Sequence, residues 1–129
     1  MDSSTTILAT RLGKVCGVDH GDVKEFLGLR YGLSTAGRRR FLPPVMAPKW
    51  DDTFDATQHP NQAMQQIKSQ SIWPPVPGEV SEDCLFLNIV TPTTQDKPRP
   101  VLFWIRGGGC VSGSATEYDG SGLAAQGDG

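Results

Sequence analysis

Glycine and proline limit the regular structure of this chain more than any other feature of its sequence. The chain has 129 residues, of which 15 are glycine and 10 are proline. Both residue types interrupt helices and mark turns. We therefore predict short strands joined by frequent turns instead of long helices.

The first thirty residues predict an antiparallel meander. Apolar or β-branched stretches at residues 5–9, 14–18 and 23–29 are separated by Gly13 and by the turn-forming residues 19–22. Short strands separated by such turns are typical of hairpins.

Two loops are expected after the meander. Residues 33–48 contain Gly37 and the pair Pro43-Pro44, which do not fit a strand or helix. Residues 58–78 are polar and rich in glutamine, so we expect a long surface loop with at most a helical turn near residues 63–67.

The second half of the chain predicts sheet strands but almost no helix that could pack over them. Residues 84–91 and 101–105 are nearly continuous apolar runs, as in strands covered on both faces of an α/β sheet. Only residues 121–126 predict the start of a helix that could cover them. We therefore expect residues 1–129 to be an incomplete N-terminal segment of a domain, mostly strand and loop, which would not unfold cooperatively alone.

Charge and cysteine content exclude several function classes. The net charge is −2, which gives no overall attraction to nucleic acid or to an anionic membrane. No basic segment followed by an apolar run opens the sequence, and the longest apolar run, residues 101–105, is too short to cross a bilayer. Three cysteines without regular spacing predict no disulfide framework and no metal site. We expect a cytoplasmic protein.

Short motifs follow one another along the chain. The most specific is S-E-D-C-L-F-L-N at residues 81–88, and W-I-R-G-G-G stands at residues 104–109. The others are F-L-G-L-R-Y at 26–31, R-F-L-P-P at 40–44, Trp50 with D-A-T at 55–57, and Y-D-G at 118–120. In this order the motifs resemble the N-terminal part of the type-B carboxylesterase/cholinesterase family, which has the α/β-hydrolase fold.

The resemblance assigns a role to the three glycines. In ester hydrolysis a carbonyl oxygen becomes an oxyanion, which fixed N–H donors stabilise. The resemblance implies that Gly108 and Gly109 are these donors and that Gly107 permits the turn. Two other readings of the glycines stay open, a tight turn after a buried strand and a dinucleotide-binding loop, although Ser112 stands where the last glycine of a G-x-G-x-x-G motif belongs.

The catalytic residues of the family are not found in this chain. A serine esterase needs a nucleophile on a G-x-S-x-G turn, a histidine base and a carboxylate. The nearest match surrounds Ser34 but lies in the loop after the meander, and His20 and His59 match no family position. We expect this chain alone to be inactive.

Several residues depart from the family pattern near the glycines. Arg106 replaces the usual histidine, where it would orient the loop or attract an anionic substrate, and Cys110 replaces an aromatic residue of the pocket wall. Trp73 lies where cholinesterases place a choline-binding tryptophan, and it binds a cation or simply packs. Trp50 and Trp104 are expected in the core.

The resemblance also predicts contacts between motifs. Arg38 and Arg39 are expected in a solvated loop, the alternative being a nucleic-acid patch, whereas Arg40 is expected to pair with Glu82. In the family, the cysteine matching Cys84 pairs with one at the position of Ala63, so Cys84 is expected to be a free, buried thiol.

Together these features predict a segment of a carboxylic ester hydrolase that acts on a small-molecule ester without cofactor or metal. A non-catalytic, interaction-type member of the same fold is the alternative, and a nucleotide-binding fragment is a third possibility. The sequence does not fix the oligomeric state.

Overall fold

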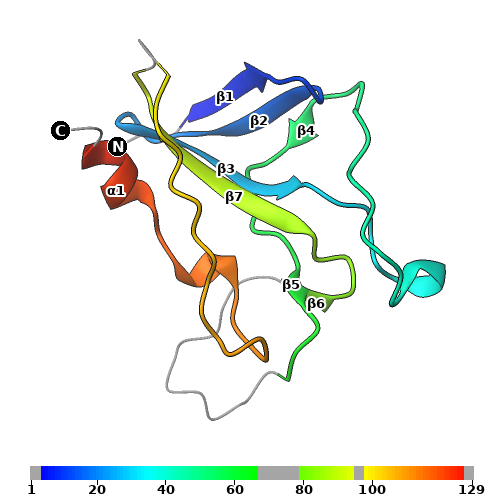
Figure 1. Cartoon of the computed structure of the whole chain (residues 1–129). Coiled ribbons are helices and arrows are strands. Elements are labelled where there is room, and N and C mark those ends of the chain that lie inside the picture. Colours follow the sequence, from blue (N-terminus) through cyan, green and yellow to red (C-terminus); the bar gives the residue numbers. More distant parts are fainter. Residues whose placement is uncertain (1–3, 67–78, 95–97, 127–129) are drawn as a thin grey trace.

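A computed structural model describes residues 4–66, 79–94 and 98–126 of the chain. A mainly antiparallel sheet forms its centre, as Figure 1 shows, with strands in the order β1, β2, β3, β7. The strands are β1 (Ser4–Ala9), β2 (Lys14–Asp19), β3 (Val23–Arg30) and β7 (Phe86–Pro92). The three predicted strands of the meander are therefore confirmed.

The strand predicted at residues 84–91 begins two residues later, because the chain first makes a tight turn. In this turn the Phe86 N–H donates to the Cys84 carbonyl oxygen at 3.0 Å. From Phe86 onward β7 pairs antiparallel with β3, with Arg30 opposite Phe86 and Val23 opposite Pro92.

Strand β2 has two partners on the same side. Its end pairs with β3 at Val18 and Asp19, while its beginning pairs in parallel with β4 (Phe54–Asp55). Ala56 joins the two, since its N–H donates to Cys16 and its carbonyl oxygen accepts from Leu27. β3 and β4 thus pair with different parts of the same edge of β2.

A small hydrophobic core lies where β2, β3 and the segment after β4 meet. Val15, Phe26 and Ala56 are buried in it, and Ala56 has no exposed surface. The rings of Trp50 and Phe54 pack beside it, 5.3 Å apart between centroids. Trp50, expected in the core, is partly buried and packs against it.

The first predicted loop is confirmed. Between β3 and β4 the chain forms a short 3-10 helix, η1 (Gly37–Arg39), and one isolated bridge between Gly32 and Met46. Backbone hydrogen bonds from Leu33 to Val45 and from Ala47 to Tyr31 hold the two ends of this loop together.

The second loop is not helical where the structure describes it. Residues 62–63 form β5 (Gln62–Ala63), which pairs in parallel with β6 (Val80–Ser81). The described part of residues 63–67 therefore contains no helical turn, and the sequence predicted at most one there. The short strand β5 was not expected. Its strand partner lies well beyond the reach of a local pattern, and strand pairing overrode local preference.

The strand predicted at residues 101–105 does not form. These five apolar residues are 64–88% exposed and pair with no described segment. Trp104, expected in the core, is itself 64% exposed and contacts Tyr118 at 5.6 Å between ring centroids. A strand needs a neighbour to complete its hydrogen bonds, and the described chain supplies none here.

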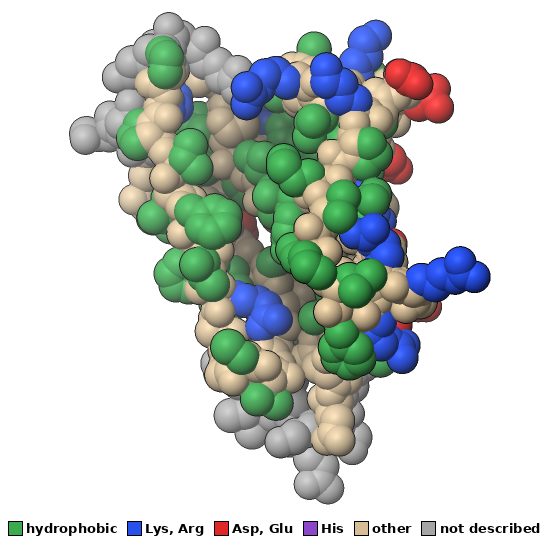
Figure 2. Space-filling view, turned by 45° about the vertical axis from the view of Figure 1, so that its right-hand side comes forward, with side chains coloured by type: hydrophobic (Ala, Val, Ile, Leu, Met, Phe, Trp, Pro, Cys, Tyr) green, Lys and Arg blue, Asp and Glu red, His purple; other side chains and the backbone are tan. Residues whose placement is uncertain are grey.

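The described chain ends in two short helices, η2 (Ala115–Glu117) and α1 (Ser121–Gln126). The helix predicted at residues 121–126 is confirmed, and it packs against β7 and β3. Among the described residues, no helix has the length and apolar character needed to span a membrane. Figure 2 shows many hydrophobic side chains exposed on one face of the molecule.

Candidate functional site

The glycine loop, residues 106–113, is a tight turn closed by its own backbone. The N–H groups of Val111 and Ser112 both donate to the Gly108 carbonyl oxygen, at 3.0 and 3.2 Å. A Cβ atom on Gly108 would lie 1.8 Å from the Ser112 carbonyl oxygen. The packing of the turn therefore requires glycine at position 108.

At Gly109 the backbone conformation, and not the packing, favours glycine. Its φ of +60° lies in the left-handed region, yet a Cβ atom there would meet no atom within 4 Å. Among the described residues, neither the Gly108 N–H nor the Gly109 N–H donates a hydrogen bond. The turn thus leaves two neighbouring donors available.

Arg106 closes the glycine loop from within. Its Nη1 donates to the carbonyl oxygens of Ser112 at 2.6 Å and Gly107 at 3.1 Å. Of the two roles expected for this residue, the geometry favours orientation of the loop, because the side chain folds back onto the backbone.

The two other residues predicted near the glycines are Cys110 and Trp73. Cys110 is an exposed free thiol with φ +59°, and its place in a pocket wall stays a prediction. Trp73 lies outside the described residues. Two hollows of the described surface lie away from the glycine loop, one between the β2–β3 hairpin and α1 and one over the sheet near Phe26.

Gln65 connects the glycine loop to another part of the chain. Its Oε1 accepts from the Gly113 N–H at 2.8 Å, and its Nε2 donates to the Gly113 carbonyl oxygen at 3.1 Å. Sequence reasoning missed this residue, because its glutamine-rich surroundings look like an ordinary polar loop.

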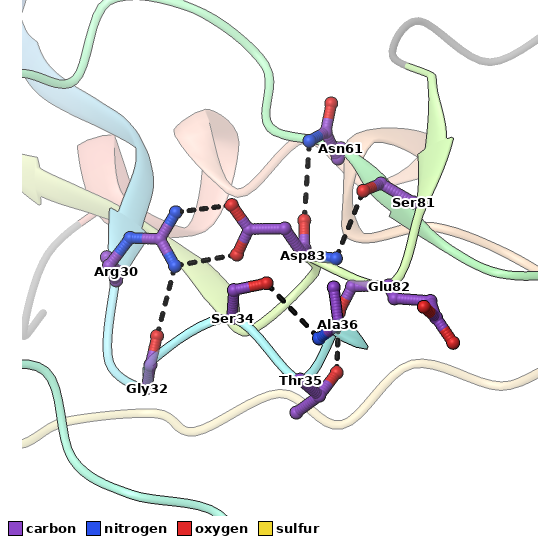
Figure 3. A network of polar contacts seen from close by, with 9 residues as sticks. All are labelled: Arg30, Gly32, Ser34, Thr35, Ala36, Asn61, Ser81, Glu82 and Asp83. Carbon is purple, nitrogen blue, oxygen red and sulfur yellow. Dashed lines mark hydrogen bonds and ion pairs between the residues drawn. The ribbon is translucent and has the colours of Figure 1, made fainter. Parts of the chain in front are cut away.

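A polar network around Asp83, drawn in Figure 3, joins the S-E-D motif to the end of β3. Arg30 donates to both carboxylate oxygens of Asp83 at 2.7 Å, and its Nη1 also donates to the Gly32 carbonyl oxygen at 3.2 Å. The guanidinium lies 4.4 Å from the centroid of the Phe86 ring. Hydrogen bonding from Arg30 lowers the pKa of Asp83, and the same bond raises the pKa of Arg30.

The backbone of the S-E-D motif is held by neighbouring side chains. Ser81 Oγ accepts from the Asp83 N–H at 3.0 Å, and Asn61 Nδ2 donates to the Asp83 carbonyl oxygen at 3.3 Å. Thr35 donates to the Glu82 carbonyl oxygen at 2.5 Å (Figure 3). The motif is therefore hydrogen-bonded both to the segment before β5 and to the loop after β3.

The expected ion pair between Arg40 and Glu82 is present. Arg40 Nε lies 2.5 Å from Glu82 Oε1, and Nη2 donates to Oε2 at 2.7 Å. This hydrogen bonding lowers the pKa of Glu82. The two adjacent acids of the motif therefore pair with different arginines. Glu82 pairs with Arg40 of the loop after β3, and Asp83 pairs with Arg30 of β3.

No described residues form a Ser-His-acid triad. Ser34 Oγ accepts from the Ala36 N–H at 3.3 Å within its own turn, which fits a structural role. His20 Nε2 lies 3.3 Å from Glu25 Oε2 on the β2–β3 hairpin.

The cysteines remain separate in the described chain. Cys16, Cys84 and Cys110 are all free, and no group of three His, Cys, Asp or Glu side chains among the described residues could hold a metal ion. Cys84 is half-buried, not fully buried as expected, and burial raises the pKa of its thiol. A thiol in such surroundings is poorly reactive.

Comparison with known proteins identifies the source of these shared motifs. The sequence profile of the carboxylesterase family matches residues 4–128, nearly the whole chain. The chain belongs to the carboxylesterase family.

Curated carboxylesterase relatives and solved structures agree with this assignment. The para-nitrobenzyl esterase of Bacillus subtilis is 38% identical over 125 residues, which cover 95% of this chain and 25% of that protein. The acetylcholinesterase of Electrophorus electricus is 38% identical over 141 residues, covering 95% and 22%. A solved structure of a PNB esterase superposes with a TM-score of 0.85 at 35% identity, covering 95% of this chain and 26% of that one.

The carboxylesterase chain described here spans about a quarter of the length of these relatives. Its fold, a mainly antiparallel sheet with loops and little helix, is that of the N-terminal part of an α/β hydrolase. The predicted fold class is therefore confirmed.

Proposed function

We propose that this chain is the N-terminal segment of a carboxylic ester hydrolase and contributes the oxyanion-hole donors Gly108 and Gly109. The observation that carries the proposal is the pair of unbonded N–H groups in a turn fixed by Arg106. Fixed donors of this kind stabilise an oxyanion without reorganising, and losing one costs about 2.7–4 kcal/mol in other enzymes.

The two hollows noted on the described surface lie away from the glycine loop, so other protein would have to complete a substrate pocket there. An oxyanion hole faces a nucleophile, and the described residues hold no serine paired with a histidine. The exposed residues 101–105 lead directly into the loop, and their apolar surface suits cover by further protein. We infer that the nucleophile, the histidine base and the protein surface that covers residues 101–105 all lie outside the described residues.

Hydrolysis of a p-nitrophenyl ester tests the first part. The isolated chain should show no turnover above the buffer rate. Turnover that a serine-directed inhibitor abolishes would contradict the proposal, because it would reveal a nucleophile within these residues.

A chimera tests the donors. Residues 4–126 replace the matching segment of the B. subtilis para-nitrobenzyl esterase, which supplies the remaining three-quarters of the fold. We expect the chimera to hydrolyse the ester, and Gly109→Ala to lower kcat about 100-fold, the lower end of the effect of a lost donor, because the new methyl group occupies the space beside the free N–H groups.

Gly37→Ala is the matched control. Gly37 has φ +61°, against +60° for Gly109, and a Cβ atom would meet no atom within 4 Å at either position. The two substitutions therefore introduce the same backbone strain. An equal loss of kcat in the two variants would show that Gly109 serves the turn and not the reaction.

The non-catalytic alternative predicts a different result. If the segment came from an interaction-type member, its glycine loop would not support turnover in the chimera. A folded chimera that does not hydrolyse the ester would therefore favour that alternative.

A further inference from the structure

We propose that Gln65 is a positioning residue for the oxyanion loop, acting through Gly113. This inference rests on the proposed function. Among the described residues, the hydrogen bonds that tie the glycine loop to another part of the chain both involve Gln65. In Figure 1 the green segment after β5 runs beside the orange turn.

The chemistry of the contact suits a primary amide. Gly113 presents an N–H at 2.8 Å and a carbonyl oxygen at 3.1 Å to the same side chain. A primary amide offers an acceptor and a donor on two separate atoms, whereas a carboxylate offers acceptors alone and an aliphatic side chain offers neither. Gln65 thus fixes both the position and the orientation of the peptide at Gly113.

Gln65 is itself held by its own segment. Its Nε2 also lies 3.2 Å from the Ala63 carbonyl oxygen and 3.3 Å from Gln62 Oε1. Gln62 is buried, and both neighbours belong to β5, which pairs with β6. Because the Gln65 side chain is held in place, its hydrogen bonds can restrain the position of Gly113 in the glycine loop.

The polar network of Figure 3 anchors this segment in turn. Asn61, just before β5, donates to the Asp83 carbonyl oxygen, and Ser81 of β6 accepts from the Asp83 N–H. Contacts therefore run without interruption from the S-E-D motif through β5 and Gln65 to Gly113. From there Arg106, whose Nη1 would lie 2.7 Å from a Cβ atom on Gly113, braces the peptides before and after the proposed donors.

Amide hydrogen exchange of the whole 129-residue chain tests the contact itself. Gln65→Leu should speed exchange of the Gly113 N–H about tenfold, the effect of one lost hydrogen bond. Gln65→Glu keeps the acceptor and should retain most of the protection. Gln66→Leu is the matched control, since Gln66 is exposed and bonds to no described residue. Unchanged Gly113 exchange in Gln65→Leu would overturn the inference.

Kinetics of the chimera described above test the role. We expect Gln65→Leu to lower kcat about tenfold with KM unchanged, because a displaced loop weakens stabilisation of the transition state and leaves ground-state binding intact. Gln65→Glu should recover part of kcat, and Gln66→Leu should have no effect. A rise in KM alone would contradict a positioning role.

The two proposals fail in different ways. If Gly109→Ala lowers kcat and Gln65→Leu does not, only the inference about Gln65 is wrong. If Gly109→Ala has no more effect than Gly37→Ala, the oxyanion-hole proposal itself is wrong.

Discussion

Arg30 and Asp83, 53 residues apart in the sequence, meet through two parallel hydrogen bonds of 2.7 Å each. Arg30 ends β3 and Asp83 precedes β7, so the pair fixes the end of the β3–β7 ladder. Their side chains are 25% and 31% exposed, and the geometry is the two-pronged form that makes an arginine–carboxylate pair specific.

Removing Arg30 should raise the pKa of Asp83. In the native chain hydrogen bonding from Arg30 holds this pKa below its usual value. We expect Arg30→Met to move the titration midpoint of the Asp83 carboxyl up toward the ordinary value of about 3.9, as followed by carbon-detected NMR. Asp55, whose pKa is lowered by Thr57, serves as an internal control and should not move.

The same pair should make the fold sensitive to acid. A carboxyl whose pKa is lowered on folding adds stability above its unfolded pKa, and this stability is lost as pH falls through the lowered folded value. We therefore expect Arg30→Met to lose less structure than the native chain between neutral pH and about pH 3, by far-ultraviolet circular dichroism. A steeper loss in the variant would contradict this assignment.

Replacing Ala63 with cysteine should restore the cross-link that the resemblance implies. We expect Ala63→Cys to form a disulfide with Cys84 under oxidising conditions and to stabilise the chain by about 3 kcal/mol, the usual gain for a loop of this size. Thiol titration in denaturant should then find only Cys16 and Cys110 reactive. Ala63→Ser is the control, and four reactive thiols after oxidation of Ala63→Cys would count against the alignment of Ala63 with the family's cysteine.

The exposed residues 101–105 should make the isolated chain self-associate. Apolar segments with unpaired backbone groups are prone to pair with other chains. We expect Phe103→Lys to weaken association roughly tenfold or more, since burying one such side chain is worth about 1.5–3 kcal/mol, as measured by analytical ultracentrifugation. Leu123→Lys is the control, because Leu123 is 67% exposed but lies on α1, outside this run. Equal effects of the two substitutions would show that association is not specific to residues 101–105.

Local patterns predicted the elements whose partners are close in the sequence. The meander of β1 to β3 needed only turns near Gly13 and Gly21, and the motif order identified the family. The Arg40–Glu82 pair followed from the resemblance, not from either residue alone.

Elements that depend on distant partners were not predictable in this way. β5 forms because Val80 and Ser81 lie beside it, and the contact of Gln65 with Gly113 has no signature in either segment. Residues 101–105 show the opposite case, since their pattern is that of a strand but no described neighbour pairs with them. The cytoplasmic location and the roles of Gly107, Gly108 and Gly109 stay predictions.

Hydrogen bonds of amide and carbonyl groups hold the segment from Asn61 to Gln65 in place. Ala63 stands where the family resemblance places a cysteine. Such hydrogen bonds are lost in denaturant but do not depend on thiol reagents. The anchorage of the glycine loop in this chain should therefore be the same in dithiothreitol as in air.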